Sequence, residues 1–126
     1  MKDDSLARDM YKEHILELYK DPPNFGILKN PTSEHRAHNP LCGDDISVGV
    51  QVKDGILVDA KFHGKGCAIS IASAALVIDS AIGKKISEIK AWQKEHALEL
   101  LGIPVGPVRM KCALIGLEAL HKAIER

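Results

Sequence analysis

The chain has 126 residues, the usual size of one domain, and 45% of them are hydrophobic, which excludes a disordered protein. Seventeen Lys and Arg residues balance seventeen Asp and Glu residues, so there is no general attraction to nucleic acid or to an anionic membrane. The longest weakly polar run, residues 66–78, is shorter than the roughly 20 apolar residues that cross a bilayer. The N-terminal residues are charged where a signal peptide is apolar. We therefore expect one cytoplasmic domain over residues 1–126, with no membrane and no nucleic-acid partner.

The N-terminal part of the chain predicts a helix followed by a connecting segment. Over residues 5–20, apolar side chains recur every three or four positions, and Ser5 is a suitable N-cap. Pro22 and Pro23 end this helix, because proline interrupts helical hydrogen bonding. Residues 22–41 are rich in Pro, Asn and Gly, which predicts a connector with room for a short edge strand.

Two runs of alternating residues predict a β-hairpin. Apolar and polar residues alternate over residues 45–53 and again over residues 56–63. Asp54 and Gly55 join the two runs, and Asp-Gly is a preferred pair in two-residue hairpin turns. This hairpin is the strongest local signal in the chain.

Helical segments follow the hairpin. Residues 68–82 are rich in Ala and Ser and are closed by Gly83, a residue type that favours a helix C-terminus. Residues 87–101 predict one or two short helices with Ser87 as cap, and residues 108–125 carry an apolar stripe at helical spacing. This order of elements predicts an α+β domain with a small antiparallel sheet and helices packed on one face.

Each of the three cysteines stands at the boundary of a predicted element. Cys42 precedes the first hairpin strand, Cys67 lies between the second strand and the following helix, and Cys112 lies in the first turn of the last helix. An odd number excludes a closed disulfide framework, and no pair has the CxxC spacing of a zinc ribbon or a thioredoxin motif. The hairpin brings Cys42 and Cys67 to one end of the sheet, whereas nothing local places Cys112 beside them.

The surroundings of these cysteines favour thiolate chemistry. Cys67 and Cys112 both occupy a helix N-terminus, where free N–H groups stabilise a thiolate. Lys111 and Arg109 add positive charge near Cys112, and Asp44 offers a carboxylate close to the first cysteine. Three thiolates and one carboxylate would form a four-coordinate site for zinc or iron.

The same residues also have an ordinary structural interpretation. Buried cysteines are often inert, small hydrophobic side chains. Asp44 suits a turn with Asp45, and Lys111 and Arg109 suit a solvated helix surface. Among the histidines, His63 is nearest to a cysteine and is a weaker candidate ligand. The residue pattern alone leaves both interpretations open.

Short motifs occur in a fixed order around the hairpin: Tyr11–Ile15, Asn30-Pro31, Asn39–Asp44, Gly64–Ala74 and Lys111–Leu114. In these motifs, and over essentially the whole chain, the sequence resembles the IscU/NifU/SufU family of iron–sulfur cluster assembly scaffolds. The resemblance implies a three-stranded antiparallel sheet with helices packed against it. It also implies that Cys42, Cys67 and Cys112 hold a transient [2Fe–2S] cluster, with Asp44 beside them as ligand or regulator.

The resemblance further implies a scaffold and not an enzyme. Such a protein receives persulfide sulfur from a cysteine desulfurase, assembles the cluster and passes it to apo iron–sulfur proteins. Cys112 and Cys42 are the candidate persulfide acceptors, with Lys111 and Arg109 as modulating charges. Iron is the metal of the cluster, and zinc could occupy the apo site because thiolates suit both metals. We expect a monomer or a weak dimer.

Two departures from the family pattern keep an alternative open. Members of the IscU branch usually carry His immediately before the third cysteine, where this chain has Lys111. The Arg-x-Lys-Cys pattern is similar to the SufU branch, whose members bind zinc tightly and relay sulfur, although the chain is too short for the SufU insertion before the last helix. The alternative is therefore a zinc-containing sulfurtransferase that relays persulfide sulfur without building a cluster. A structural zinc domain is a third possibility.

Residues 103–109 also differ from the Leu-Pro-Pro-Val-Lys segment that a dedicated Hsp70 chaperone recognises, which puts that partner in question.

Overall fold

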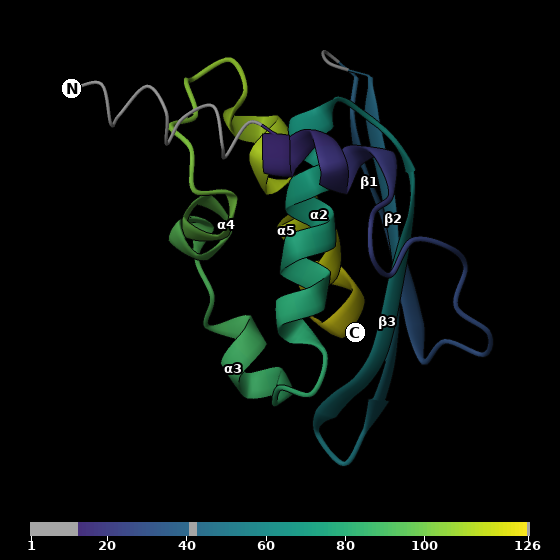
Figure 1. The fold of residues 1–126 in the computed structure, drawn as a ribbon. Helices are drawn as coiled ribbons and strands as arrows, with labels where there is room; N and C mark the ends of the chain where they lie inside the picture. Colours follow the sequence, from purple (N-terminus) through teal and green to yellow (C-terminus); the bar gives the residue numbers. More distant parts are fainter. Residues whose placement is uncertain (1–12, 41–42, 126) are drawn as a thin grey trace.

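A three-stranded antiparallel sheet forms one layer of the molecule, and helices cover one of its faces (Figure 1). The computed structural model describes residues 13–40 and 43–125. The strands follow one another in space as in sequence: β1 (Ser33–Asn39), β2 (Asp44–Lys53) and β3 (Ile56–Lys65). The predicted α+β class and the three-stranded sheet that the family resemblance implied are confirmed.

The predicted hairpin is present as β2 and β3. Asp54 and Gly55 connect the strands with φ angles of 54° and 75°, the left-handed conformation that a tight two-residue hairpin turn requires. The apolar residues on one side of each strand face the helices and are fully buried: Ile46, Val48 and Val50 on β2, and Ala60 and Phe62 on β3. Burial of this face fixes the register, because a slip by one residue would expose all of these side chains.

Strand β1 occupies part of the segment that the sequence predicts as a connector. It pairs antiparallel with β2, from Ser33 opposite Val50 to Asn39 opposite Asp44. Only Ala37 and Asn39 of this strand are buried, and the other side chains are half-buried or exposed. An edge strand with polar side chains has little apolar alternation, so its sequence signal is weak.

Two helices lie against the sheet, and two shorter helices lie on their far side (Figure 1). In chain order the helices are α2 (Ala68–Ala81), α3 (Ile86–Lys90), α4 (Lys94–Leu101) and α5 (Met110–Glu125). Helices α2 and α5 form the layer next to the sheet, and α3 and α4 cover them. Most of α2 is buried, as its small and apolar residues predict.

The predicted cap at Ser87 is wrong, because Ser87 lies inside α3 and Lys85 is the N-cap. The reason is a contact between distant segments. Lys85 forms a bridge with Ile56, and the backbone N–H of Ile86 donates to the carbonyl of Gly55 at 2.8 Å. The end of the hairpin therefore sets where this helix begins.

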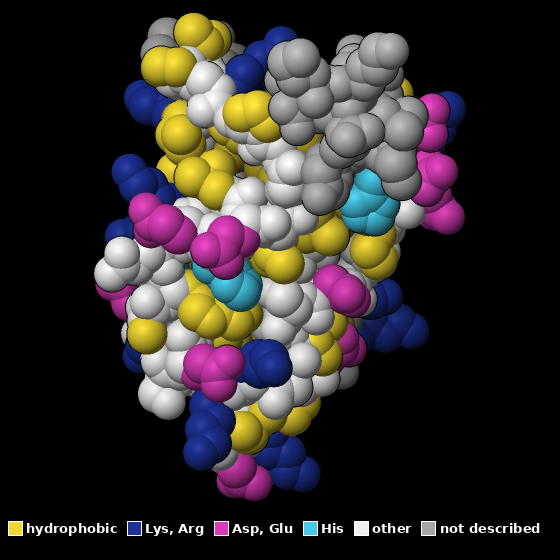
Figure 2. Space-filling view, turned by 60° about the vertical axis from the view of Figure 1, so that its left-hand side comes forward, with side chains coloured by type: hydrophobic (Ala, Val, Ile, Leu, Met, Phe, Trp, Pro, Cys, Tyr) yellow, Lys and Arg dark blue, Asp and Glu magenta, His cyan; other side chains and the backbone are white. Residues whose placement is uncertain are grey.

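Residues 13–20 are helical and end before Asp21, as predicted, whereas the expected start at Ser5 lies outside the described residues. Within the described ranges, no helix combines the length and the apolar character needed to cross a bilayer. On the face drawn in Figure 2, basic and acidic side chains are interspersed.

Helices α2 and α5 approach each other closely near their middle. A Cβ atom added to Gly116 would lie 2.6 Å from the Cα of Ala74, so this contact has no room for a larger residue. The hydroxyl of Ser73 donates to the carbonyl of Ala113 across the same contact. The packing of these two helices thereby fixes the first turn of α5 beside the start of α2.

Candidate metal centre

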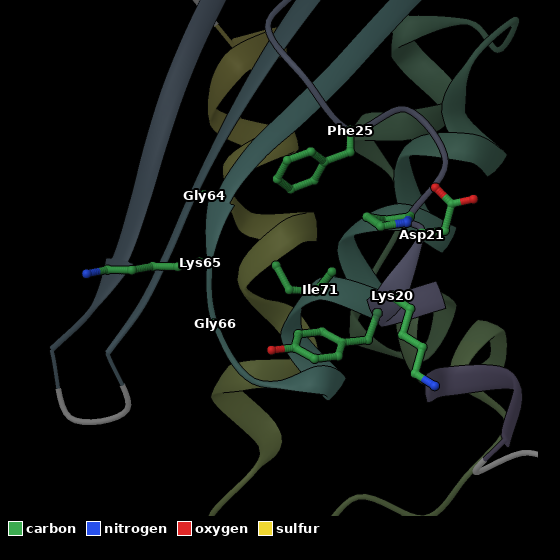
Figure 3. Close-up of a pocket in the computed structure, with 9 residues that line it drawn as sticks. Lys20, Asp21, Phe25, Gly64, Lys65, Gly66 and Ile71 are labelled. Carbon is green, nitrogen blue, oxygen red and sulfur yellow. The ribbon is translucent and has the colours of Figure 1, made fainter. Parts of the chain in front are cut away.

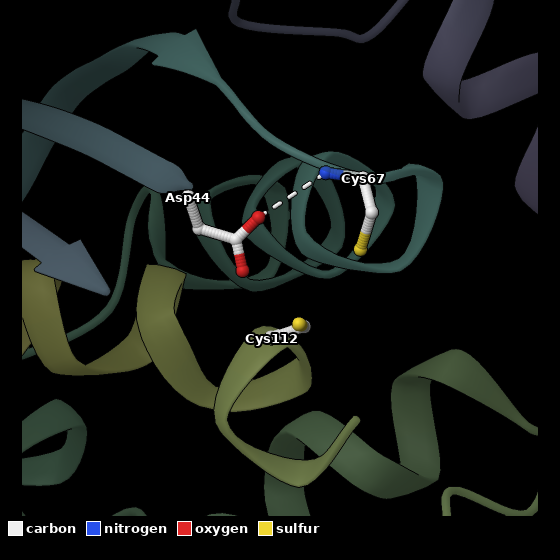
Figure 4. A group of neighbouring side chains, drawn as sticks. All are labelled: Asp44, Cys67 and Cys112. Atoms are coloured by element: carbon white, nitrogen blue, oxygen red, sulfur yellow. Dashed lines mark hydrogen bonds between the residues drawn. The ribbon is translucent and has the colours of Figure 1, made fainter. Parts of the chain in front are cut away.

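Asp44, Cys67 and Cys112 come together at the end of the sheet where the hairpin meets α2 and α5 (Figure 4). A carboxylate oxygen of Asp44 and the Sγ atoms of the two cysteines all lie within 4.8 Å of one another. Asp44 begins β2, Cys67 is the N-cap of α2 and Cys112 lies in the first turn of α5. The structure thus brings together three of the four predicted ligands, and the fourth, Cys42, lies outside the described residues.

The Asp44 carboxylate is fully buried and is held by one of its oxygens. Oδ1 accepts hydrogen bonds from the backbone N–H of Cys67 and from the hydroxyl of Ser70, each at 3.2 Å. Oδ2 is buried and has no hydrogen-bond partner among the described residues. A buried carboxylate oxygen without a hydrogen-bond partner lowers the stability of the folded protein unless a cation pairs with it.

The neighbouring Asp45 has a different role. Its carboxylate receives two hydrogen bonds from Arg36 on β1, at 2.7 and 2.5 Å, on the exposed side of the sheet. The Arg36 side chain lowers the pKa of Asp45 by hydrogen bonding and by its charge. The turn interpretation of Asp44 is therefore wrong, because Asp44 points into the protein and Asp45 takes the surface contact.

The three residues fit a thiophilic metal. Four ligands around one tetrahedral zinc, with Zn–S bonds of about 2.3 Å, are separated from one another by about 3.8 Å. The observed upper limit of 4.8 Å exceeds this separation by about 1 Å, so the ligand atoms lie near the spacing of a metal site. Thiolates bind both zinc and iron, and the unpaired Oδ2 of Asp44 supplies a harder oxygen donor.

The surroundings of Cys67 favour the thiolate form relative to an ordinary cysteine. Burial raises the pKa of this thiol, but the backbone N–H groups of Ser70 and Ile69 and the Ser70 hydroxyl outweigh burial, with a further contribution from Cys112. The pKa of Cys67 consequently lies below the ordinary thiol value. Free N–H groups at the start of a helix have this effect on a cysteine, as the sequence predicts.

The predicted modulating residues lie on the surface near the centre. Lys111 and Arg109 are both exposed. Lys111 lines a cavity of about 340 Å³ on the β1 side of α5, together with His38 and Asn39. His63, the weaker ligand candidate, is half-buried on β3 opposite Ser47 and does not belong to the cluster of ligand atoms.

Two residues at the centre were not singled out from the sequence. Ser70 donates to Asp44, and Gly66 leaves the space in which they meet. A Cβ atom on Gly66 would lie 2.3 Å from the Ser70 Oγ and 2.8 Å from the Asp44 Oδ1. The signal that could have identified Ser70 is its position three residues after Cys67, which places both residues on one turn of the helix.

A larger cavity of about 550 Å³ lies next to the metal centre (Figure 3). Phe25 and Ile71 contribute apolar walls, and the strand end from Gly64 to Gly66 forms another side. Gly66 directly precedes Cys67, so the cavity and the centre share this strand end. Of the described residues that line the cavity, none is Asp44, Cys67 or Cys112.

The chain is similar in sequence to known proteins of two kinds. The chain is 31% identical to the zinc-dependent sulfurtransferase SufU of Bacillus subtilis (strain 168), covering 93% of this chain and 90% of that protein. It is also 31% identical to the iron–sulfur cluster assembly scaffold protein IscU of Thermotoga maritima, covering 93% of this chain and 94% of that protein.

A solved structure shares the fold. This structure is the crystal structure of FiSufU from Fervidobacterium islandicum AW-1, which is described as an iron–sulfur cluster assembly scaffold protein for the SUF system. It matches with a TM-score of 0.76 and 26% sequence identity. The match covers 89% of this chain and 94% of that one. The family described as NifU-like N terminal domain matches residues 10–126. The chain therefore belongs to the NifU-like N-terminal domain family.

Proposed function

We propose that this chain is an iron–sulfur cluster assembly scaffold, a carrier and not a turnover enzyme. The observation that carries the proposal is the convergence of Asp44, Cys67 and Cys112 from three elements, with the Asp44 Oδ2 buried and lacking a hydrogen-bond partner among the described residues. The likeness to IscU of Thermotoga maritima supports the same role. Cys42, two residues before Asp44, is the predicted fourth ligand.

In the proposed role, iron and sulfur are cargo. A desulfurase persulfide is attacked by a thiolate of the scaffold, with Cys112 and Cys42 as the candidate acceptors. A new S–S bond forms to the terminal sulfur, the old S–S bond breaks, and the desulfurase leaves as a thiolate, so this step is redox-neutral. Each transferred sulfur then needs two electrons from an external donor to become sulfide. Two sulfides and two iron ions complete a [2Fe–2S] cluster.

The donor set suits temporary binding. Thiolates hold iron firmly, whereas a carboxylate is a harder and more exchangeable ligand. The Asp44 position is then the one at which the cluster can exchange ligands with an apo-protein. The proposed setting is the cytosol, with residues 1–126 acting as one domain and a cysteine desulfurase and apo iron–sulfur proteins as partners.

A zinc-containing sulfurtransferase is the second candidate. It is favoured by the likeness to the zinc-dependent SufU of Bacillus subtilis and by Lys111, which stands where the IscU branch usually has histidine. A protonated lysine has no lone pair for a metal, so it cannot replace that imidazole. Under this alternative, the same residues would hold zinc and pass on sulfur.

Anaerobic reconstitution with iron, cysteine and a cysteine desulfurase tests the proposal. A visible [2Fe–2S] spectrum that appears with the wild-type chain and is lost in Cys67→Ala supports the scaffold. Tight zinc binding with faster desulfurase turnover, and no cluster, supports the sulfurtransferase instead. Zinc binding without any effect on the desulfurase contradicts both and indicates a structural zinc domain.

A further inference from the structure

We propose that Ser70 is a positioning residue of the metal centre. Its hydroxyl holds one oxygen of Asp44, so that the carboxylate presents its other oxygen to the metal as a single-atom ligand. This inference rests on the proposed metal binding by Asp44, Cys67 and Cys112, and it assigns a role to a residue outside that ligand set.

The position of Ser70 gives it contact with two of the ligand residues at once. It is fully buried in the first turn of α2. Its Oγ lies 2.9 Å from the carbonyl oxygen of Cys67, 3.2 Å from the Oδ1 of Asp44 and 3.6 Å from the Sγ of Cys67. A serine hydroxyl has one proton, so it can donate to one of these acceptors at a time. All three acceptors belong to residues of the metal centre.

The two oxygens of Asp44 have unequal surroundings. Oδ1 accepts hydrogen bonds from the Cys67 N–H and from Ser70, whereas Oδ2 is equally buried and has no such partner among the described residues. In Figure 4, the second carboxylate oxygen, Oδ2, points away from the Cys67 N–H and toward helix α5, which carries Cys112. The terminal torsion of an aspartate is broad, so the carboxylate would rotate without this restraint. The restraint leaves one oxygen available and makes two-oxygen coordination unfavourable.

Gly66 makes the contact between Ser70 and Asp44 possible. A Cβ atom at position 66 would lie 2.3 Å from the Ser70 Oγ and 2.8 Å from the Asp44 Oδ1, which is closer than real Cβ contacts allow. Any side chain there would push the hydroxyl and the carboxylate out of place. Gly66, between the end of β3 and Cys67, therefore belongs to the same positioning arrangement.

A double-mutant cycle tests whether Ser70 acts through Asp44. Zinc affinity is measured by chelator competition for the wild type, Ser70→Ala, Asp44→Ala and the double variant. We expect Ser70→Ala to weaken zinc binding about 10-fold in the wild-type background, since hydrogen-bond partners of metal ligands typically contribute 10- to 100-fold. In the Asp44→Ala background, we expect the same substitution to change affinity less than about 2-fold. The absorption bands of bound Co²⁺ should shift in Ser70→Ala, because the oxygen ligand is no longer fixed.

Ser80→Ala is the matched control. The Ser80 hydroxyl donates to the carbonyl of Val77, at 2.8 Å, and lies near the other end of α2, away from the metal centre. We expect zinc affinity and the Co²⁺ spectrum of this variant to equal those of the wild type. If Ser70→Ala does not fold, Gly66→Ala perturbs the same pair from the junction of β3 and α2 and must show the same dependence on Asp44.

The outcomes separate this inference from the proposed function. If the wild type binds no zinc tightly, or if Asp44→Ala keeps full affinity, the metal centre itself is wrong and the role of Ser70 falls with it. If Asp44→Ala weakens binding but Ser70→Ala matches the wild type, only the role of Ser70 is overturned. An equal loss from Ser70→Ala in both backgrounds also overturns it, because Ser70 would then act independently of Asp44.

Discussion

Asp44 combines two properties that are rarely found together, full burial and an oxygen with no hydrogen-bond partner among the described residues. A cation is the natural complement of such an oxygen. A carboxylate also exchanges more readily than a thiolate on a thiophilic metal. Under the proposed function, Asp44 would contribute to zinc affinity as one of four ligands, and it would also be the most exchangeable ligand of an iron–sulfur cluster.

The two proposed roles of Asp44, as a zinc ligand and as the exchangeable ligand of a cluster, predict different effects of Asp44→Ala. Zinc affinity falls because one ligand is lost, whereas cluster transfer to an apo-protein slows and the cluster resists oxygen because the exchangeable position is gone. Chelator competition measures the first effect, and decay of the visible cluster spectrum under air or with an apo-acceptor measures the second. A cluster that decays faster in Asp44→Ala than in the wild type would contradict this role of Asp44.

The lowered pKa of Cys67 predicts the pH at which the metal-free thiol reacts. The thiolate is the nucleophile, so alkylation of Cys67 should reach half its maximal rate at a lower pH in the folded protein than in the denatured chain. Peptide-resolved mass spectrometry after iodoacetamide pulses follows this cysteine separately from the others. Equal midpoints in the folded and denatured protein would contradict the effect of the helix N-terminus.

Lys111 is predicted to act on Cys112 through its charge. The side chain is exposed and follows the start of α5, so it raises the local positive potential without occupying the metal centre. Lys111→Gln should raise the pH at which Cys112 alkylates and should slow persulfide arrival from the desulfurase, whereas Lys111→Arg should preserve both. An alkylation profile of Lys111→Gln that overlays the wild type would return Lys111 to the role of a solvated surface residue.

At the scale of elements, the contact between α2 and α5 determines where Cys112 lies. Gly116 faces Ala74 at the point of closest approach, and Ser73 bonds to the carbonyl of Ala113, the residue after Cys112. Cys112 therefore reaches the centre through helix packing and not through its neighbours in the sequence.

Gly116→Ala tests this dependence. The added methyl group would lie 2.6 Å from the Cα of Ala74, and overpacking of this kind costs about 1–3 kcal/mol. The better helix propensity of alanine offsets up to about 1 kcal/mol. We expect a net loss of about 1–2 kcal/mol in the free energy of unfolding, measured in urea, together with weaker zinc binding. Gly106→Ala is the control, because none of the described residues has an atom within 4 Å of its added Cβ. Unchanged stability and zinc affinity in Gly116→Ala would show that the helices can move apart freely.

The elements that the sequence predicts well are those with strong local signals. The hairpin follows from alternation and from Asp54-Gly55, and the end of α2 follows from Gly83, whose φ of 93° suits a helix terminus. Strand β1 was expected only as a short edge strand of unspecified position within a connector, because its exposed polar residues lack a period. The start of α3 was missed because a backbone bond from Ile86 to Gly55 sets it.

The features of the candidate site are also of two kinds: some can be predicted from local sequence, and others depend on contacts across the fold. Cysteines at element boundaries, a helix N-terminus and an adjacent carboxylate are visible in the sequence, and the hairpin relates the first two cysteines. Three features depend on contacts across the fold: the place of Cys112, the burial of Asp44 and the bond from Ser70. Local patterns carry no information on such contacts, so a resemblance to a family was needed to predict that the three cysteines meet.

For the whole molecule, the metal centre joins segments that are far apart in the sequence. Asp44 comes from the start of β2, Cys67 from the junction of β3 and α2, and Cys112 from the start of α5. A metal bound there would link the sheet to both helices of the inner layer, and binding energy would add to the stability of the folded chain. This arrangement suits the proposed carrier role, because a metal would be loaded and released at one end of the fold.

The measurement that tests the account most directly is the zinc affinity of Cys112→Ala by chelator competition. Cys112 is the proposed ligand that helix packing, and no neighbour in the sequence, brings to the centre. We predict that Cys112→Ala binds zinc at least about 10-fold more weakly than the wild type, as do Cys67→Ala and Cys42→Ala, since loss of one of four ligands exposes the metal. Thermal unfolding of the metal-free variants checks that each remains folded. Full zinc affinity in a folded Cys112→Ala protein would contradict the shared metal centre.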